Sequence, residues 1–275
     1  MNEETQSPAP HPWIYTVIAV LILAVMLFPF YWMINGSLQP NGNTLQGSWW
    51  PAEPNLGGYW SALQQQGANL LTSLVVALGA IAVSLLIATP AAYALTHFQL
   101  PGTKIVLLGI LFSQMIPGIV VANALYRGYS DVGLLNSVPG LIFADCTTGI
   151  PFAILVTMAF MEAIPKEILD AARVDGASHL RTLWSIVVPV SRNALITSGI
   201  FAFLFAWSDF LFALTLTTDD TVRPVTLGIY LYLGAHVSNW SAVMATAVLA
   251  SLPAVVLLTI AQRYVAAGAT GGAVK

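Results

Sequence analysis

Two acidic residues lie inside long apolar stretches of the sequence, and they are the first candidates for chemistry. Asp145 and Asp209 each sit in a hydrophobic segment, and a carboxylate at membrane depth usually faces a cavity or a polar partner. At about 1.5 Å per helical residue, Asp145 lies roughly 10 Å and Asp209 roughly 12 Å below the same membrane surface. This similar depth predicts a polar path through the protein. The competing interpretation is a carboxyl group that is hydrogen-bonded between helices or to a second membrane subunit.

The other polar residues are weaker candidates. The amides of Gln114 and Asn123 can line the same path, although an uncharged amide in a helix bundle more often holds helices together. The histidines are scattered, without the i, i+4 spacing of a metal site: His11, His97, His179 and His236. The stretch Gly102-Thr103-Lys104 lacks the earlier glycine of a phosphate-binding loop. We therefore expect no enzymatic activity and no metal or cofactor bound by this chain.

The composition indicates that lipid surrounds much of the protein. Of its 275 residues, 57% are hydrophobic and only 8% are charged, whereas soluble proteins carry about 25% charged residues. The net charge of −3 argues against a nucleic-acid partner. The single cysteine, Cys146, excludes an internal disulfide.

The expected fold is all-α, a polytopic membrane protein with six transmembrane helices. A bilayer core about 30 Å thick requires about 20 apolar residues per helix. The first helix is expected at 13–35, and the others at about 70–95, 105–126, 138–161, 194–217 and 241–261. Prolines lie inside most of these segments: Pro29, Pro90, Pro117, Pro151 and Pro253. Because packed neighbours can satisfy the carbonyls that a proline frees, we expect kinks rather than interruptions.

The basic residues set the orientation, since lysine and arginine concentrate on the cytoplasmic side. Seven lie after the second, fourth and sixth segments, and two lie after the first, third and fifth. This distribution places both termini in the cytoplasm. It predicts a cytoplasmic N-terminus at 1–12, an external loop at 36–68, a cytoplasmic loop at 162–192 and a cytoplasmic tail at 264–275. Small residues at every fourth position predict close helix packing: Ala80, Ser84, Ala88 and Ala92, then Ala242, Thr246, Ala250 and Ala254.

The loop at 162–192 differs from its surroundings, because it is rich in charge and carries apolar residues at helical spacing. Pro165 suits a helix start, and Glu167 stands where a carboxylate favours the positive end of the helix dipole. Asp170 can pair with Arg173 on one face. The loop therefore predicts either an amphipathic helix pair on the membrane surface or a docking surface for a soluble partner.

The run from Asp170 to Ala177, with Ile186 and Pro189 after it, resembles the coupling-loop signature of bacterial ATP-binding-cassette (ABC) importer permeases. That pattern reads Glu-Ala-Ala, two residues, Asp-Gly-Ala, and later an aromatic residue, Ile and Leu-Pro. Asp170 replaces the Glu, Leu183 the aromatic residue and Val188 the Leu. The tail from Arg263 to Lys275 is similar to the end of the maltose-type second permease subunit of the carbohydrate subfamily. The stretch Trp207-Ser208-Asp209-Phe210 resembles the Trp-Asn-Asp/Glu-Phe element of the family, with Ser208 in place of Asn.

The resemblance implies a type I importer fold over 69–263, in the cytoplasmic or inner membrane. It implies a second permease subunit, two copies of an ATPase that binds ATP and Mg, and an extracytoplasmic sugar-binding protein or lipoprotein. The ATPase-coupling residues it implies are Glu167, Asp170, Ala171, Ala172, Arg173, Asp175, Gly176 and Ala177. The substrate would be a carbohydrate: a di- or oligosaccharide, a monosaccharide or a polyol. Asp209 and Asp145 would accept hydrogen bonds from its hydroxyl groups, and Trp207 would cover the apolar side of its ring.

Two features leave alternatives open. The loop after the fifth segment contains Tyr230, Tyr232 and His236, which by resemblance face the binding protein, although a solvated hairpin explains them equally well. The main alternative function is a proton-coupled secondary sugar transporter that uses Asp145 and Asp209 as proton relays. Such carriers normally show internal repeats, which we do not find in this sequence. A membrane scaffold or enzyme is the third interpretation.

Overall fold

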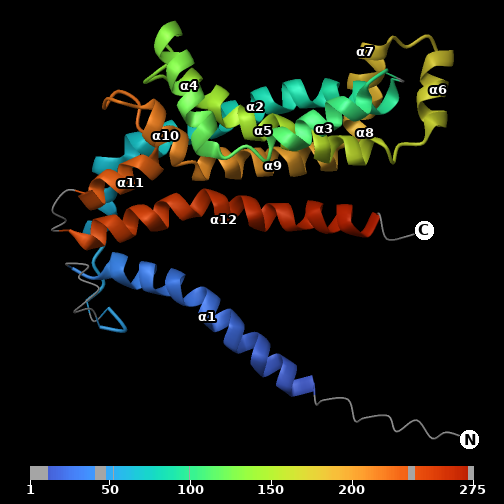
Figure 1. Ribbon diagram of the computed structural model, residues 1–275. Helices are drawn as coiled ribbons and strands as arrows, with labels where there is room; N and C mark the ends of the chain where they lie inside the picture. The colour runs from blue at the N-terminus through green and yellow to red at the C-terminus, as the bar shows by residue number, and fades with distance from the viewer. Residues whose placement is uncertain (1–11, 41–47, 52, 99, 235–238, 272–275) are drawn as a thin grey trace, which may run out of the picture. The chain divides into compact units, whose positions relative to one another are not determined.

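All secondary structure in the described part of the chain is helical (Figure 1). The computed structural model describes residues 12–40, 48–51, 53–98, 100–234 and 239–271. The helices are α1 (Pro12–Leu38), α2 (Gly57–His97), α3 (Thr103–Ser113), α4 (Gly118–Val132), α5 (Val138–Met161), α6 (Lys166–Val174), α7 (His179–Thr182), the π-helix η1 (Leu183–Val187), α8 (Val188–Val190), α9 (Arg192–Ser208), α10 (Leu211–Leu216), α11 (Val225–Gly234) and α12 (Trp240–Gly271).

Four of the described helices are long and apolar enough to cross a bilayer. They are Trp13–Leu38 in α1, the whole of α2 and α5, and Trp240–Gln262 in α12. Two bent pairs pass the same test, α3 with α4 and His179–Val190 with α9, so the described residues provide up to six spans. This confirms the prediction of an all-α polytopic membrane protein.

Four of the five intramembrane prolines lie inside continuous helices: Pro29 in α1, Pro90 in α2, Pro151 in α5 and Pro253 in α12. Pro117 differs. The helix stops at Ser113, and α4 resumes at Gly118 after a bend of 95°. Bonds of the i to i−3 type close the end of α3, including Met115 N–H to the Phe112 carbonyl at 3.0 Å. The expectation of a mere kink is therefore wrong at this position.

The fifth predicted segment is also divided. The helix α9 ends at Ser208, the backbone of Asp209 is extended, and α10 begins at Leu211. At the other end, α2 begins at Gly57, well before the expected start near residue 70. Its first turns carry Gln64, Gln65 and Gln66, and polar residues of this kind extend a helix beyond the bilayer without adding to hydropathy. The last helix likewise continues to Gly271.

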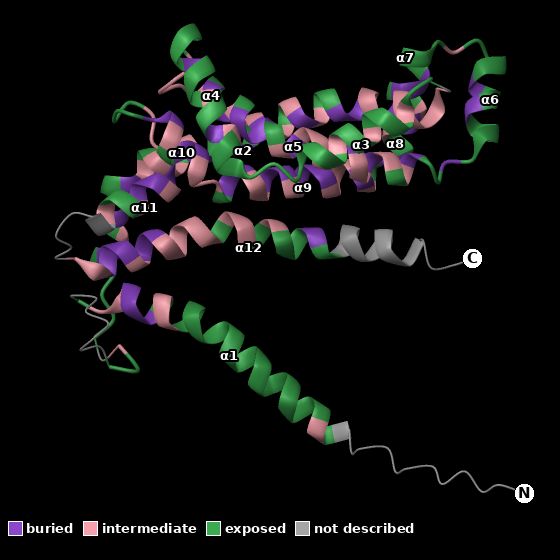
Figure 2. Cartoon of the chain, in the orientation of Figure 1, coloured by how far each residue is buried: buried purple, intermediate pink, exposed green. Residues whose placement is uncertain are grey.

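The described chain divides into two compact units, and the first contains residues 1–64 and 236–249. Its largest element, α1, is apolar and exposed over nearly its whole length (Figure 2). An aromatic group joins its end to the following loop, since the Trp32 and Trp49 rings lie 5.6 Å apart. The Ser37 and Tyr59 hydroxyls share a hydrogen bond of 2.8 Å.

The second unit, residues 65–235 and 250–275, is a bundle built around α2, α5 and α9. The predicted small-residue stripe of α2 forms its packing surface, because Ala80, Ser84, Ala88 and Ala92 are all at most 1% exposed. A Cβ atom added to Gly149 of α5 would lie 2.7 Å from the Ser84 hydroxyl oxygen. Such close backbone approach is how membrane helices associate without a hydrophobic driving force.

The helices of this unit end in two different structures (Figure 1). At one end, the short helix α6 stands across the bundle and is joined to α5 and α7 by loops. At the opposite end, α4 and α10 pack with α2 and α5 around Tyr129, Leu141 and Phe212. The polar residues singled out from the sequence fall at these two ends or close to them.

Candidate functional site

The helix α6 forms because its sequence satisfies both of its ends. Pro165 precedes its first residue with φ of −57°, which suits a helix start, and Glu167 lies in the first turn. Arg173 lies in the last turn, where a cation suits the negative end of the dipole. The Asp170 carboxylate accepts a hydrogen bond of 3.1 Å from Arg173. Both side chains are about half exposed or more, so this pair contributes at most about 1 kcal/mol.

The end of α6 explains the Asp-Gly-Ala part of the sequence motif. Asp175 ends the helix, and Gly176 follows with φ of +77°. The Ala177 N–H bonds to the Ala172 carbonyl at 2.9 Å, and the Gly176 N–H bonds to the Arg173 carbonyl at 3.0 Å. This is the Schellman arrangement, which requires a left-handed residue at the Gly176 position. The glycine therefore fixes the direction in which the chain leaves α6.

One side of α6 holds it to the bundle (Figure 2). Leu169 is 5% exposed and enters a cluster with Tyr93, Met161 and Leu183. Ala172 is also buried, so it cannot form part of an exposed docking face, although Ala171 can. Ala177 is half-buried. Leu169 thus attaches the inner side of α6 to the bundle.

The segment after α6 packs against the end of α2. The Ser178 hydroxyl caps α7 by accepting a hydrogen bond of 3.4 Å from the Arg181 N–H. The ring of His179 lies edge-on to Phe98 at 4.9 Å. The π-helix η1 then buries Leu183 and Val187, and the chain turns by 80° into α9. The whole loop is thus connected to α2, α5 and α9.

Two of the five residues predicted for a polar path, Asp145 and Asp209, line a cavity of about 410 Å³. Its other lining residues come from α5, α9, α10 and the break between the last two: Thr148, Phe205, Ser208, Phe210, Leu211 and Phe212. Cavities of a few hundred Å³ with a few polar groups are the usual form of small-molecule sites. The structure therefore brings together the two acids that the sequence places at similar depth.

Asp209 has a structural partner in this cavity. Its carboxylate accepts hydrogen bonds from the N–H groups of Phe212 at 3.3 Å and Ala213 at 3.1 Å, at the start of α10. The Thr226 hydroxyl donates to its backbone carbonyl at 2.6 Å. Asp209 thus stabilises the break between α9 and α10 and joins it to α11.

Asp145 is different, because it is 7% exposed and, within the described residues, no hydrogen bond or ion pair reaches its carboxyl group. A buried carboxyl group without a partner is costly in a low-dielectric interior. Thr148, one helical turn further along α5, lines the same cavity. Asp145 is therefore the acid available to a ligand.

The remaining residues predicted for the path lie elsewhere. Trp207 is buried, donates its indole N–H to the Ala250 carbonyl at 2.9 Å and stacks on Phe203 at 5.4 Å. Gln114 lies exposed at the break between α3 and α4, and Asn123 is exposed on α4, where it donates to the Ile119 carbonyl. The structure does not bring these three residues to the cavity of Asp145 and Asp209.

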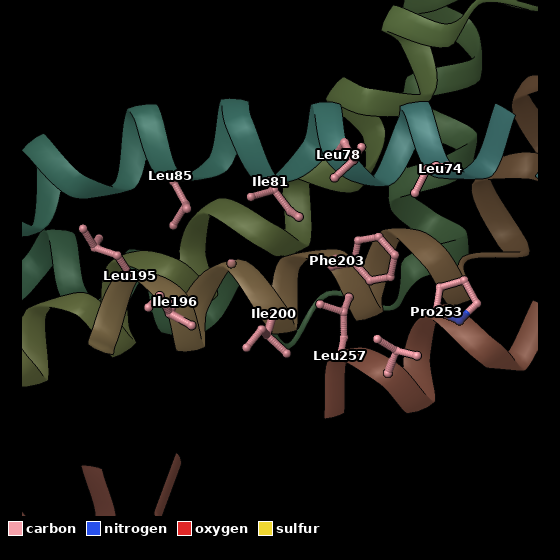
Figure 3. A pocket seen from close by; sticks show the side chains of 12 residues that line it. Leu74, Leu78, Ile81, Leu85, Leu195, Ile196, Ile200, Phe203, Pro253 and Leu257 are labelled. Carbon is pink, nitrogen blue, oxygen red and sulfur yellow. The ribbon is translucent and has the colours of Figure 1, made fainter. Parts of the chain in front are cut away.

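A second cavity, of about 530 Å³, lies between α2, α9 and the part of α12 that includes Pro253 and Leu257 (Figure 3). Its lining side chains are apolar, among them Leu78, Ile81 and Phe203. A hydrophilic cargo finds no hydrogen-bonding side chain there. The smaller, acid-lined cavity is the better candidate for a polar ligand.

The external-loop residues are only partly described. The Tyr230 ring lies 5.2 Å from Phe210, which lines the acidic cavity, yet Tyr230 remains 52% exposed. Partial burial raises the pKa of Tyr232 despite its hydrogen bond with Gln65. His236, the third residue predicted to face a binding protein, lies outside the described residues.

Sequence reasoning missed several residues at both sites. Phe205, Phe210 and Thr148 line the acidic cavity, and the i, i+3 spacing of Asp145 and Thr148 was the available signal for the last of them. At the other site, Thr96 and His97 of α2 lie next to α6. The position of His97 depends on tertiary packing, which local sequence does not reveal.

Comparison with known proteins identifies the family. Residues 84–270 match the family described as "Binding-protein-dependent transport system inner membrane component". The chain is 30% identical to the trehalose/maltose transport system permease protein MalG of Thermococcus litoralis, over 94% of both chains. It is 32% identical to the sulfoquinovosyl glycerol transport system permease protein SmoH of Agrobacterium fabrum, over 94% of this chain and 92% of that protein.

A solved structure shows the same fold. A chain of a bacterial ABC transporter involved in the import of the acidic polysaccharide alginate superposes with a TM-score of 0.78 at 20% identity, covering 94% of this chain and 99% of that chain. The resemblance in the coupling loop, the family match and the shared fold agree. This chain therefore belongs to the family of binding-protein-dependent transport system inner membrane components, and it is a multi-pass permease subunit of an ABC importer, not itself an enzyme.

Proposed function

We propose that this chain is the permease subunit of a carbohydrate importer that works by alternating access. Its cargo is a di- or oligosaccharide, a monosaccharide or a polyol, delivered by an extracytoplasmic binding protein or lipoprotein. A second permease subunit and two copies of an ATPase complete the transporter, and ATP and Mg bind to the ATPase. The carbohydrate relatives and the acid-lined cavity support this proposal.

The observation that carries the proposal is the two-sided character of α6. Its inner side is buried against the bundle through Leu169 and Ala172, whereas Glu167, Ala171 and Val174 are exposed. A helix attached on one side and open on the other can transmit the movement of a soluble motor to the bundle. Residues 162–192 are thus the coupling loop, and Asp170, Arg173, Asp175, Gly176 and Ala177 hold α6 in shape for docking.

The distribution of basic residues supports cytoplasmic positions for both termini and for the coupling loop. The external face then carries α11 with Tyr230 and Tyr232, turned toward the binding protein. Trp49 and Trp50, both more than 70% exposed, suit the membrane interface on that side.

The cavity of Asp145 and Asp209 forms part of the sugar path. The Asp145 carboxyl group accepts a hydrogen bond from a sugar hydroxyl, and Phe205 or Phe210 offers an aromatic face to the apolar side of the ring. This replaces Trp207 as the stacking residue, because the Trp207 indole is used within the bundle. Asp209 shapes the cavity by capping α10.

Membership of the ABC family disfavours a proton-coupled secondary transporter. An importer driven by ATP needs no proton relay, and the Asp209 carboxylate is engaged by the N–H groups of α10. The two acids are better explained by cargo binding and by helix capping.

Cross-linking in the assembled transporter tests the proposed docking face. In a Cys146→Ser background, which removes the chain's cysteine, we expect Ala171→Cys to cross-link to the ATPase. Thr221→Cys, which is also exposed, serves as the control and should give no such product. If Ala171→Cys stays open to a water-soluble maleimide in the complex, the docking assignment is wrong. The sugar that co-purifies with the binding protein tests the cargo class, and an amino acid or peptide there contradicts it.

A further inference from the structure

The inner side of α6 does not close completely on the bundle. A cavity of about 310 Å³ separates it from the last turn of α2 and is lined by Thr96, His97, Lys166, Leu169, Asp170 and Arg173. Four of these residues belong to α6. Counted from Lys166, they have the spacing i, i+3, i+4 and i+7, which places them along one face of a helix. Lys166, Asp170 and Arg173 are themselves exposed, and Glu167, Ala171 and Val174 lie on the adjoining stripe. The cavity thus borders the face proposed to meet the ATPase, on the side of that face toward the bundle.

The cavity carries an excess of positive charge. Asp170 is paired with Arg173 at 3.1 Å, while Lys166 makes no ion pair within the described residues. The ionised side chains in the lining, two cations and one anion, leave one net positive charge. The His97 Nε2 atom is buried and, among the described residues, has no hydrogen-bond partner. Its ring is held in place by Tyr93, whose centroid lies 5.2 Å away.

An apolar, exposed surface begins shortly after His97 in the sequence. The helix α3 begins six residues after His97, and Ile105 in its first turn is 75% exposed. Lys104, next to it, is exposed as well. An apolar surface that begins beside basic residues is typical of the level at which hydrocarbon gives way to lipid headgroups. Anionic headgroups at a cytoplasmic surface attract such basic residues.

We propose that this cavity binds the phosphate of an anionic phospholipid headgroup. Lys166 supplies the free positive charge, and the His97 Nε2–H, in the tautomer that carries a proton there, donates a hydrogen bond to a phosphate oxygen. Arg173 contributes a nitrogen that Asp170 leaves unused. A headgroup bridging α2 and α6 stiffens the link between the coupling helix and the bundle, so that the membrane's anionic lipid content affects transport.

Lipid retention by the full-length chain tests the proposal. The protein is placed in nanodiscs of phosphatidylcholine mixed with phosphatidylglycerol, and the phosphatidylglycerol molecules it retains on release are counted by native mass spectrometry. One cation near the surface is worth about 1 kcal/mol, so we expect Lys166→Gln to weaken retention about fivefold. This change removes a cation from the first turn of α6, which if anything favours the helix. Loss of retention is then not a sign of unfolding.

The matched control is Lys104→Gln, which removes an exposed cation that does not line the cavity. It should leave retention unchanged. Equal losses in Lys104→Gln and Lys166→Gln would show a general basic surface and overturn the proposal, as would full retention in Lys166→Gln.

A second variant and a second ligand source sharpen the test. His97→Phe keeps an aromatic ring beside Tyr93 and removes the hydrogen-bond donor, so we expect it to reduce retention without changing the net charge. In nanodiscs of phosphatidylcholine alone, added inorganic phosphate should bind no better to the wild type than to Lys166→Gln. Saturable phosphate binding that Lys166→Gln abolishes, without phosphatidylglycerol retention, would assign the cavity to a soluble anion and contradict the lipid proposal.

Discussion

At the level of single residues, the two buried acids have different environments and therefore different expected roles. The Asp209 carboxylate accepts two backbone hydrogen bonds from α10, whereas the Asp145 carboxyl group has no such partner within the described residues. The sequence could place both at a similar depth, but it could not separate a helix cap from a ligand-binding group. That distinction depends on the break between α9 and α10 after Ser208. The hydrophobic segment around this position contains no sequence signal for a break.

The first prediction concerns Asp145. Asp145→Asn keeps the size of the side chain and replaces one carboxyl oxygen by an amide nitrogen, and a buried polar group left without its hydrogen-bond partner costs about 1–3 kcal/mol. We expect the KM for sugar uptake to rise about tenfold or more, with basal ATPase activity retained. The neighbouring Thr147→Val, outside the cavity lining, is the control. Unchanged uptake kinetics in Asp145→Asn would remove this residue from the sugar path.

The second prediction concerns Asp209. Asp209→Ala removes the cap of α10, and loss of such a cap costs about 0.5–2 kcal/mol. We expect faster amide hydrogen exchange at residues 211–216, together with lower uptake. If uptake falls while exchange in α10 stays the same, Asp209 acts directly on the sugar and the capping role is insufficient.

The third prediction concerns Gly176. With φ of +77°, replacement by alanine costs about 1–2 kcal/mol of local strain, and proline cannot adopt this conformation at all. We expect Gly176→Ala to weaken ATPase association and Gly176→Pro to abolish coupled uptake, measured by co-purification and transport. Gly133, with φ of +73° at the end of α4, provides the control. If Gly133→Ala weakens association equally, the effect is general instability.

At the level of elements, hydrophobic length predicted which segments are helical but not where they break. The helix α5 coincides with the expected 138–161, because both of its ends have clear signals: the Ser137 hydroxyl accepts a hydrogen bond from Gly140 N–H, and charged residues follow Met161. The divisions at Gln114–Pro117 and at Asp209–Phe210 were missed. Both lie within apolar runs, where only the three-dimensional packing decides whether the helix continues.

The fourth prediction tests the packing surface of α2. Ala88 is fully buried against Ala153 and Ile154, so Ala88→Leu would overpack the bundle at a cost of about 1–3 kcal/mol. We expect a lower thermal unfolding temperature in detergent. Ala82→Leu, on an exposed position of the same helix, should have little effect. Equal shifts in the two variants would contradict the role of the small-residue stripe.

At the level of the whole molecule, the protein has no ATP-binding motif of its own and presents a helix suited to an external motor. The chain belongs to a family of binding-protein-dependent transport components, and the cavity of Asp145 and Asp209 is the place that we propose for the cargo. The sequence motif predicted the docking segment. The structure adds that Leu169 and Ala172 attach α6 to the bundle, whereas the other residues of this helix are exposed.

The central claim is most directly tested by transport in proteoliposomes. The permease is reconstituted with its second permease subunit and ATPase, the binding protein is supplied with its sugar on one side, and accumulation is measured with ATP or with a proton gradient. We expect accumulation with ATP and none with the gradient alone. Accumulation of sugar by this chain without an ATPase, driven by the proton gradient, would contradict the account.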